Sequence, residues 1–186
     1  MDMQQHKDFF EEYLNRFPDT PSLVIVRSVE LKNFPRQFLN HPILDLCCGD
    51  GFFAKTLGLK NIYGCDIDSS ALKRGEETYV YKELKLCDAR DLSLYPNSYF
   101  KTVLSNCALE HVDEINVVLL NIYRVLAEGG HLIMSVPSEL LLTSFPPKKI
   151  LVSIGFEKWG DKLLYEYNKK QTHKNICSYE KWKKAS

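Results

Sequence analysis

A short apolar run, a glycine turn and the start of a helix follow one another within residues 42–54, and this order constrains the fold more than any other stretch. The run Ile43-Leu44-Asp45-Leu46 has the character of a buried strand, and Gly49 and Gly51 lie in the turn. Because glycine has no Cβ, the main chain of this turn can approach a ligand closely. The following helix offers free N–H groups and the positive end of its dipole. We therefore expect a ligand beyond the end of this strand.

The turn is compatible with two kinds of nucleotide cofactor. With its acidic Asp45 it resembles the first motif of class I S-adenosylmethionine (SAM) dependent methyltransferases, in which the acid and the glycine loop surround the methionine part of SAM. Residues 49–54 also fit the dinucleotide pattern G-x-G-x-x-G/A, and Asp66 lies near the distance expected of a ribose-binding acid. Asp45 favours SAM, but this stretch alone leaves NAD and FAD open.

Strand and helix patterns alternate strictly from residue 43 onward. Strands alternating with helices indicate a parallel sheet with right-handed crossovers, and so an α/β fold. Asp68 or Ser69 can cap the second helix, and Gly129-Gly130 is a C-cap signal for the third. The expected strands are 43–47, 61–65, 83–87, 100–105 and 131–136, and the expected helices are 51–58, 69–77 and 113–127.

Two segments flank this alternating core, which spans residues 43–137. Residues 1–42 predict a helical cap with helices over 6–17 and 22–33, the second with Ser22 as a plausible N-cap. Residues 138–186 contain many lysines and aromatic residues with poor periodicity. We expect both flanking segments to cover the pocket and select the substrate.

Acidic residues follow the second and third predicted strands. In open parallel sheets, ligands bind beyond the carboxyl ends of the strands. Asp66 can accept hydrogen bonds from both ribose hydroxyls, and Asp88 with a nearby N–H can read the edge of adenine. Each residue could instead only cap the next turn.

Three further stretches make the resemblance to class I SAM-dependent methyltransferases specific. They are Ile62–Asp68, Ser105–Val112 and Arg124–Leu132, which look like the second motif, the fourth motif and the entry to the fifth strand. Residues 27–31 also resemble a leader found in one bacterial branch. The resemblance implies a doubly wound, Rossmann-like sheet in the order 3-2-1-4-5 with SAM as cofactor. It implies cofactor contacts by Asp45, Cys47, Gly49, Gly51, Asp66, Ile67, Asp88, Ala89 and Asn106.

His111 lies where family members often have a histidine beside the transferring methyl group. It could act as a general base, or it could orient the substrate or pack at a helix start. Methyl transfer to an already nucleophilic atom needs only alignment and desolvation, in which case no base is essential.

The sequence departs from the family in two places. Cys47 replaces the first glycine of the family's G-x-G-x-G, and nothing after Pro137 reads as the final antiparallel hairpin. Without that hairpin, the edge of the fifth strand would be unpaired. We therefore expect either a fragment of a longer protein or a homodimer formed through this edge.

The composition of the chain restricts its expected binding partners and its expected location in the cell. The formal charge is zero among 186 residues, which argues against nucleic acid and for a small-molecule substrate. No apolar run approaches the roughly 20 residues of a membrane span, and the polar start lacks a signal-peptide core, so we expect a cytoplasmic protein.

The six cysteines show no C-x-x-C spacing, so we expect reduced, buried thiols, no disulfide framework and no metal site. Cys47, beside the turn, is the candidate for oxidation. Two alternatives to a methyltransferase remain: a non-catalytic SAM-binding or partner protein, and an NAD-binding oxidoreductase.

Overall fold

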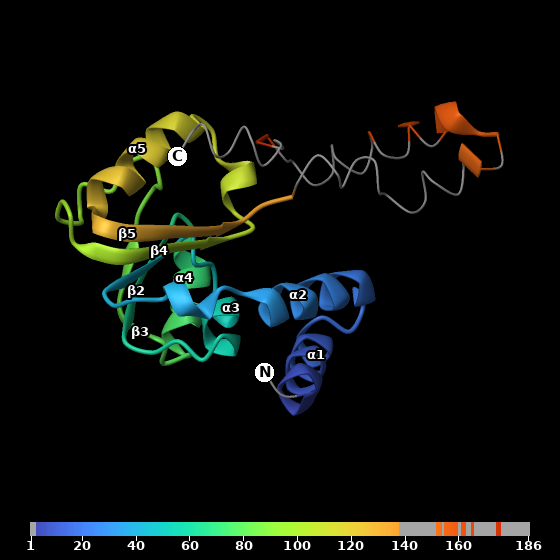
Figure 1. The fold of residues 1–186 in the computed structure, drawn as a ribbon, viewed down its shortest axis with the longest axis horizontal. Helices are drawn as coiled ribbons and strands as arrows, with labels where there is room; N and C mark the ends of the chain where they lie inside the picture. The colour runs from blue at the N-terminus through green and yellow to red at the C-terminus, as the bar shows by residue number, and fades with distance from the viewer. Residues whose placement is uncertain are drawn as a thin grey trace.

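Five parallel strands form one sheet in the spatial order β3-β2-β1-β4-β5 (Figure 1). This confirms the predicted doubly wound α/β class and strand order. The order reverses between β1 and β4, and this reversal is the point at which such sheets bind ligands. The strands are β1 (Ile43–Leu46), β2 (Ile62–Asp66), β3 (Tyr81–Leu86), β4 (Phe100–Asn106) and β5 (Leu126–Ser135).

The computed structural model describes residues 3–137 and, beyond them, 152–153, 155–159, 161–162, 165 and 174–175. The predictions for the segment 138–186, including the fate of the final hairpin, therefore fall almost entirely outside the described residues. Within the described ranges, the sheet contains only the five parallel strands. No helix in the same ranges is both long enough and apolar enough to cross a membrane.

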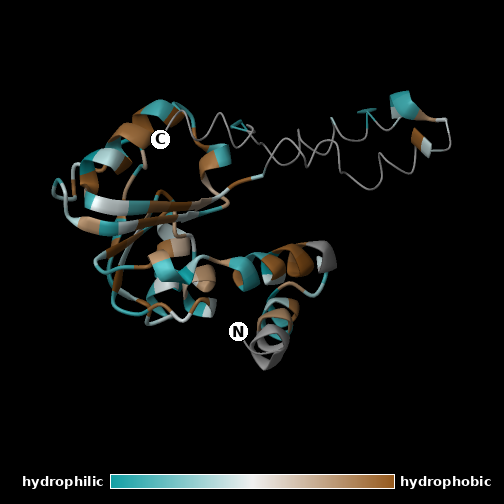
Figure 2. Ribbon diagram, in the orientation of Figure 1, coloured by the Kyte–Doolittle hydropathy of each residue, from teal (hydrophilic) through white to brown (hydrophobic). Residues whose placement is uncertain are grey.

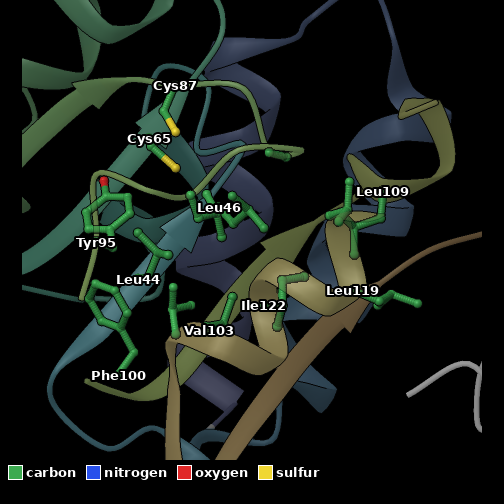
Figure 3. Close-up of a cluster of buried hydrophobic side chains, with 14 residues drawn as sticks. Leu44, Leu46, Cys65, Cys87, Tyr95, Phe100, Val103, Leu109, Leu119 and Ile122 are labelled. Carbon is green, nitrogen blue, oxygen red and sulfur yellow. The ribbon is translucent and has the colours of Figure 1, made fainter. Parts of the chain in front are cut away.

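Helices cover both faces of the sheet (Figure 1). On one face lie α3 (Phe52–Thr56) and α4 (Ser69–Glu76), and on the other lies α5 (Ile115–Val125). Alternate residues of β1 serve the two faces: Ile43 packs with Ala54 of α3, whereas Leu44 and Leu46 pack in the cluster that α5 covers (Figure 3). Both faces of β1 are buried, which explains its nearly continuous apolar sequence.

The predicted N-terminal helices are present as α1 (Met3–Arg16) and α2 (Pro21–Asn33). Phe9 and Tyr13 of α1 and Leu31 of α2 form a buried cluster with Leu57 and Leu104. This packing places α2 beside the end of β4. Figure 2 shows that α2 is apolar along much of its length, and Val26 is 62% exposed.

The prediction of Ser22 as N-cap was wrong. Thr20 is the N-cap residue, and Pro21 occupies the first turn. Proline suits that position because its missing N–H would have no helical partner there and its φ is already helical.

The predicted boundary between the last helix and strand was also wrong. The helix α5 ends at Val125, and Gly129-Gly130, predicted to cap it, lies inside β5. The register with β4 shifts between Phe100 and Thr102, as in a bulge. A Cβ added to Gly130 would lie only 3.1 Å from the Phe100 carbonyl oxygen. Gly130 therefore permits a close approach of the main chain, whereas Gly129 has open space around it and a left-handed φ of 69°.

The short 3-10 helices are η1 (Arg36–Phe38) and η2 (Leu109–His111). The remaining predicted elements agree with the structure to within about two residues at each end, as differing definitions of element ends allow. Asp68 does cap α4, because its side chain accepts hydrogen bonds from the N–H groups of Ser70 and Ala71.

Candidate active site

The glycine turn after β1 has three left-handed residues. The φ angles are 57° at Cys47, 56° at Gly49 and 72° at Gly51. Cys47 thus adopts a conformation that favours glycine, and for a residue with a Cβ it costs about 1–2 kcal/mol. A Cβ added to Gly49 would meet no atom within 4 Å, so the turn has open space beside it.

Asp45 lies beneath this turn and is 4% exposed. The Tyr81 hydroxyl donates a hydrogen bond of 2.7 Å to Asp45 Oδ2. Burial raises the pKa of Asp45 to about 7, and the nearby charge of Asp66 adds to this rise, while the Tyr81 hydrogen bond opposes it. Tyr81 also fills the space beside Gly51, where an added Cβ would lie 2.6 Å from its ring. The sequence analysis missed Tyr81, because nothing marks a tyrosine at a strand start as a partner of the turn.

Asp66, at the end of β2, holds the turn in place. Its Oδ2 accepts the Gly49 N–H at 2.8 Å, and its Oδ1 accepts the Asp68 N–H at 2.9 Å. An ionised carboxylate has about four acceptor sites, so each oxygen keeps capacity for a ribose hydroxyl. Ile67, beside it, is 69% exposed and offers apolar surface to a base.

Asp88, after β3, is already engaged by Arg90. The Arg90 guanidinium donates to both carboxylate oxygens, at 2.6 Å for the shortest contact, and this lowers the pKa of Asp88. Arg90 also contacts Glu114 at 3.3 Å. Ala89 has a buried side chain, which leaves its main chain as the part that could read adenine.

Asn106, at the end of β4, is directed toward α2. Its Oδ1 accepts a hydrogen bond from Arg27 at 2.9 Å, and its Nδ2 donates to Glu30 at 2.5 Å. Arg27 and Glu30 are paired at 2.7 Å, and Arg27 also contacts Cys107 Sγ at 2.8 Å. The sequence analysis noted residues 27–31 as a leader but gave them no role in the site.

Two acid–base residues lie in η2, just beyond this cluster. Glu110 is 2% exposed, and burial raises its pKa. His111 is 40% exposed at its side chain, with Nε2 3.8 Å from Glu110 Oε1. The N–H groups of Lys174 and Asn175 donate to the Glu110 carbonyl oxygen. Part of the C-terminal segment therefore lies against η2.

The N-terminal helices also contact the glycine turn. Arg16, at the end of α1, forms an ion pair of 2.8 Å with Asp50, and its guanidinium lies 5.8 Å from the centre of the Phe52 ring. The sequence alone did not indicate this pair, because its members lie in different predicted segments.

The cysteines near the site are free thiols, of which Cys65 and Cys87 are buried and Cys47, Cys48 and Cys107 are partly buried. Burial and the nearby carboxylates raise the pKa of Cys47 to about 12, which opposes the oxidation expected of it. Cys65, in β2, and Cys87, just after β3, point toward each other (Figure 3), and a hydrogen bond between their thiols raises the pKa of Cys65. In the described part of the chain, no group of His, Cys, Asp or Glu side chains is arranged to hold a metal.

The structure thus joins some predicted residues and separates others. Asp45, Gly49, Gly51 and Asp66 form one connected unit, with Cys47 in the same turn. Asp88 and Ala89 follow the next strand, at the same edge of the sheet. Asn106 belongs instead to the cluster with α2.

Comparisons with known proteins agree with this geometry. Residues 44–134 match the sequence profile of the methyltransferase domain family. An uncharacterized methyltransferase of Mycobacterium tuberculosis is 30% identical over 93 residues, which cover 48% of this chain and 47% of that protein. A demethylmenaquinone methyltransferase of Anoxybacillus flavithermus is 30% identical over 111 residues, covering 55% of this chain and 47% of that protein. The match spans about half the length of these relatives.

Solved structures share the fold at low identity. One is a SAM-dependent methyltransferase of Thermotoga maritima, described as a possible histamine N-methyltransferase, with a TM-score of 0.65 at 20% identity. The superposition covers 98% of this chain and 77% of that protein. A SAM-dependent methyltransferase of Archaeoglobus fulgidus has a TM-score of 0.64 at 20% identity, and the superposition covers 93% of this chain and 71% of that protein. Residues 44–134 of this chain therefore match the methyltransferase domain family, and the sheet has the Rossmann-like fold of these solved structures.

Proposed function

We propose that this protein binds SAM and transfers its methyl group to a small-molecule acceptor. The observation that carries the proposal is the double use of Asp66, which orients the glycine turn and keeps acceptor capacity for a ribose. The open space beside Gly49 fits the methionine part of SAM. The family match of the core and the names of its relatives support the same reaction.

In this proposal, each residue of the site contacts the part of SAM that lies nearest to it. Gly49 and Gly51 admit the methionine part, Asp66 and Ile67 hold the ribose and base, and Asp88 with Ala89 lies toward adenine. Bound SAM supplies a sulfonium methyl group that a nucleophile attacks in line, with S-adenosylhomocysteine as product. Alignment and exclusion of water supply much of the rate in such a transfer. We propose the half-exposed His111 as the general base for acceptors that must lose a proton, whereas an already nucleophilic acceptor needs no base.

Calorimetry of SAM binding tests the cofactor site. Asp66→Ala removes charge-assisted hydrogen bonds to the ribose, so we expect roughly 10- to 100-fold weaker binding, or about 1.5–3 kcal/mol. Asp66→Asn keeps one acceptor oxygen and should lose less affinity for SAM. Asp19→Ala, at an exposed aspartate between α1 and α2, is the matched control. Unchanged affinity in Asp66→Ala would refute the assignment.

A non-catalytic SAM-binding protein remains the alternative. Normal SAM affinity without formation of S-adenosylhomocysteine, across amines, alcohols and acids, would favour it. Co-purification of NAD in place of SAM would favour an oxidoreductase.

We further propose that residues 1–42 and the segment after 137 cover the site. Two contacts support the first part: Arg16 reaches Asp50 in the turn, and Arg27 reaches Asn106. The contact of Lys174 and Asn175 with Glu110 supports the second. Hydrogen exchange with and without SAM should show new protection in α1 and α2, and its absence would count against a lid.

We also propose a homodimer through the edge of β5. In the described residues, β5 is the last strand on its side of the sheet. A groove beside it is lined mainly by apolar residues of α5 and β5, namely Asn116, Leu119, Leu120, Ile122, Tyr123, Leu126 and Leu132. Sedimentation equilibrium should show a dimer that Leu120→Glu weakens, and a monomer at all concentrations would contradict this. We propose a lack of nucleic-acid binding from the zero net charge, and a cytoplasmic location from the polar start and the short apolar runs of the sequence.

A further inference from the structure

Glu110 carries a buried oxygen that the surrounding protein does not satisfy. The residue is 2% exposed, and within the described part of the chain its Oε2 accepts no hydrogen bond. Leaving a buried polar atom unpaired is costly, and for a carboxylate the cost is higher still. A ligand with an N–H or O–H donor would remove this cost.

The charges around Glu110 leave negative charge in surplus. Arg27 and Glu30 are the charged groups of α2 that act on it, and His111 is its neighbour in η2. Arg27 is already paired with Glu30 at 2.7 Å, and their side chains are only 19% and 15% exposed. One buried cation therefore faces two carboxylates, so an added cation would be stabilised here.

This surplus lies near the strand ends of the proposed cofactor site. Arg27 and Glu30 both bond Asn106, at the end of β4, and β4 pairs with β1, the strand that leads into the glycine turn. Cys107, next along the chain, donates its N–H to the Ser135 carbonyl oxygen at the end of β5. The carboxylates thus flank the strand ends beside the point where the sheet order reverses.

We propose that Glu110 and Glu30 bind an amine and that the amine nitrogen is the methyl acceptor. This inference rests on the proposed methyltransferase function and names its substrate class. The ammonium form gives one proton to the Glu110 carboxylate, and the nitrogen lone pair then attacks the methyl carbon. A C–N bond forms as the C–S bond breaks. The positive charge of the sulfonium ends on the methylated nitrogen, and neutral S-adenosylhomocysteine leaves.

Binding to the protein saturated with S-adenosylhomocysteine tests the inference without requiring turnover. The probes are n-butylamine and phenethylamine, with the corresponding alcohols and carboxylates as matched competitors. We expect the amines to bind at least tenfold more tightly than either, and to be the compounds that mass spectrometry finds methylated when SAM is supplied. Equal or tighter binding of the alcohols or carboxylates overturns the inference.

Two variants locate the effect. Glu110→Gln should weaken amine binding at least tenfold and leave the affinity for S-adenosylhomocysteine within twofold. Glu30→Gln, in a less buried position, leaves the charge of Arg27 uncompensated. This variant should bind amines more weakly and carboxylates more tightly than the wild type does. Glu128→Gln, exposed near the opposite end of β5, is the matched control and should change neither.

The outcomes separate this inference from the proposed function. A wild-type protein that binds neither SAM nor S-adenosylhomocysteine refutes the proposed function. A protein that binds both but takes no amine, or a folded Glu110→Gln variant with unchanged amine affinity, overturns the amine inference alone.

Discussion

Replacing Asp45 by asparagine should stabilise this protein at alkaline pH. The carboxyl group is fully buried, and its pKa is raised from 3.8 to about 7. A raised pKa means that the folded protein holds the proton more tightly than the unfolded chain does. The contribution of Asp45 to stability is therefore most favourable below about pH 4, falls as the pH rises toward 7, and is lost above it. The asparagine side chain of this variant would carry no charge and could still accept the Tyr81 hydrogen bond.

The magnitude follows from the size of the shift. About three pKa units at about 1.4 kcal/mol each give an upper limit of about 4 kcal/mol at pH 8. We expect a gain of about 2–4 kcal/mol in the free energy of unfolding for Asp45→Asn at pH 8, and little gain at pH 4. Urea unfolding at both pH values measures it. Asp19→Asn, at an exposed site, is the control.

One result would refute this reasoning. If Asp45→Asn shows the same change in stability between pH 4 and pH 8 as the wild type, the buried carboxyl does not titrate in this window. Glu110 also has a raised pKa, so the comparison is the difference between variant and wild type. The same variant should bind SAM less well if the charge of Asp45 is used by the cofactor.

Three shorter predictions concern the same turn. Tyr81→Phe removes the hydrogen bond to the buried Asp45 and should cost about 1–3 kcal/mol of stability at pH 8, measured by urea unfolding; no loss would contradict the geometry. Cys47→Gly relieves a left-handed residue with a Cβ and should raise stability by up to about 1 kcal/mol, whereas Cys47→Val should lower it. The Cys47 thiol should react slowly with iodoacetamide at pH 8, because its pKa is about 12, and rapid labelling of the folded protein at this position would show otherwise.

Local patterns in the sequence were sufficient for the strands and the helices, whereas the strand order followed from the resemblance to class I SAM-dependent methyltransferases. A buried strand followed by glycines and a helix has few stable arrangements, and repeated alternation leaves a parallel sheet. Asp66 and Asp88 could be placed because the carboxyl ends of parallel strands meet at one edge of the sheet. The exception among local signals was Gly129-Gly130, where a left-handed φ at Gly129 and a close approach of the main chain at Gly130, not a helix end, favour glycine.

The sequence by itself determined the class of fold and which acidic residues lie at the ends of the parallel strands, since both depend on residues close together in the chain. Only the tertiary structure decided what those positions touch. Tyr81 reaches Asp45 across 36 residues, and Arg27 reaches Asn106 across 79. Such contacts depend on how α2 and β3 pack against the sheet, which no local pattern encodes. For the same reason the buried, unsatisfied Glu110 became visible only when the chain was folded.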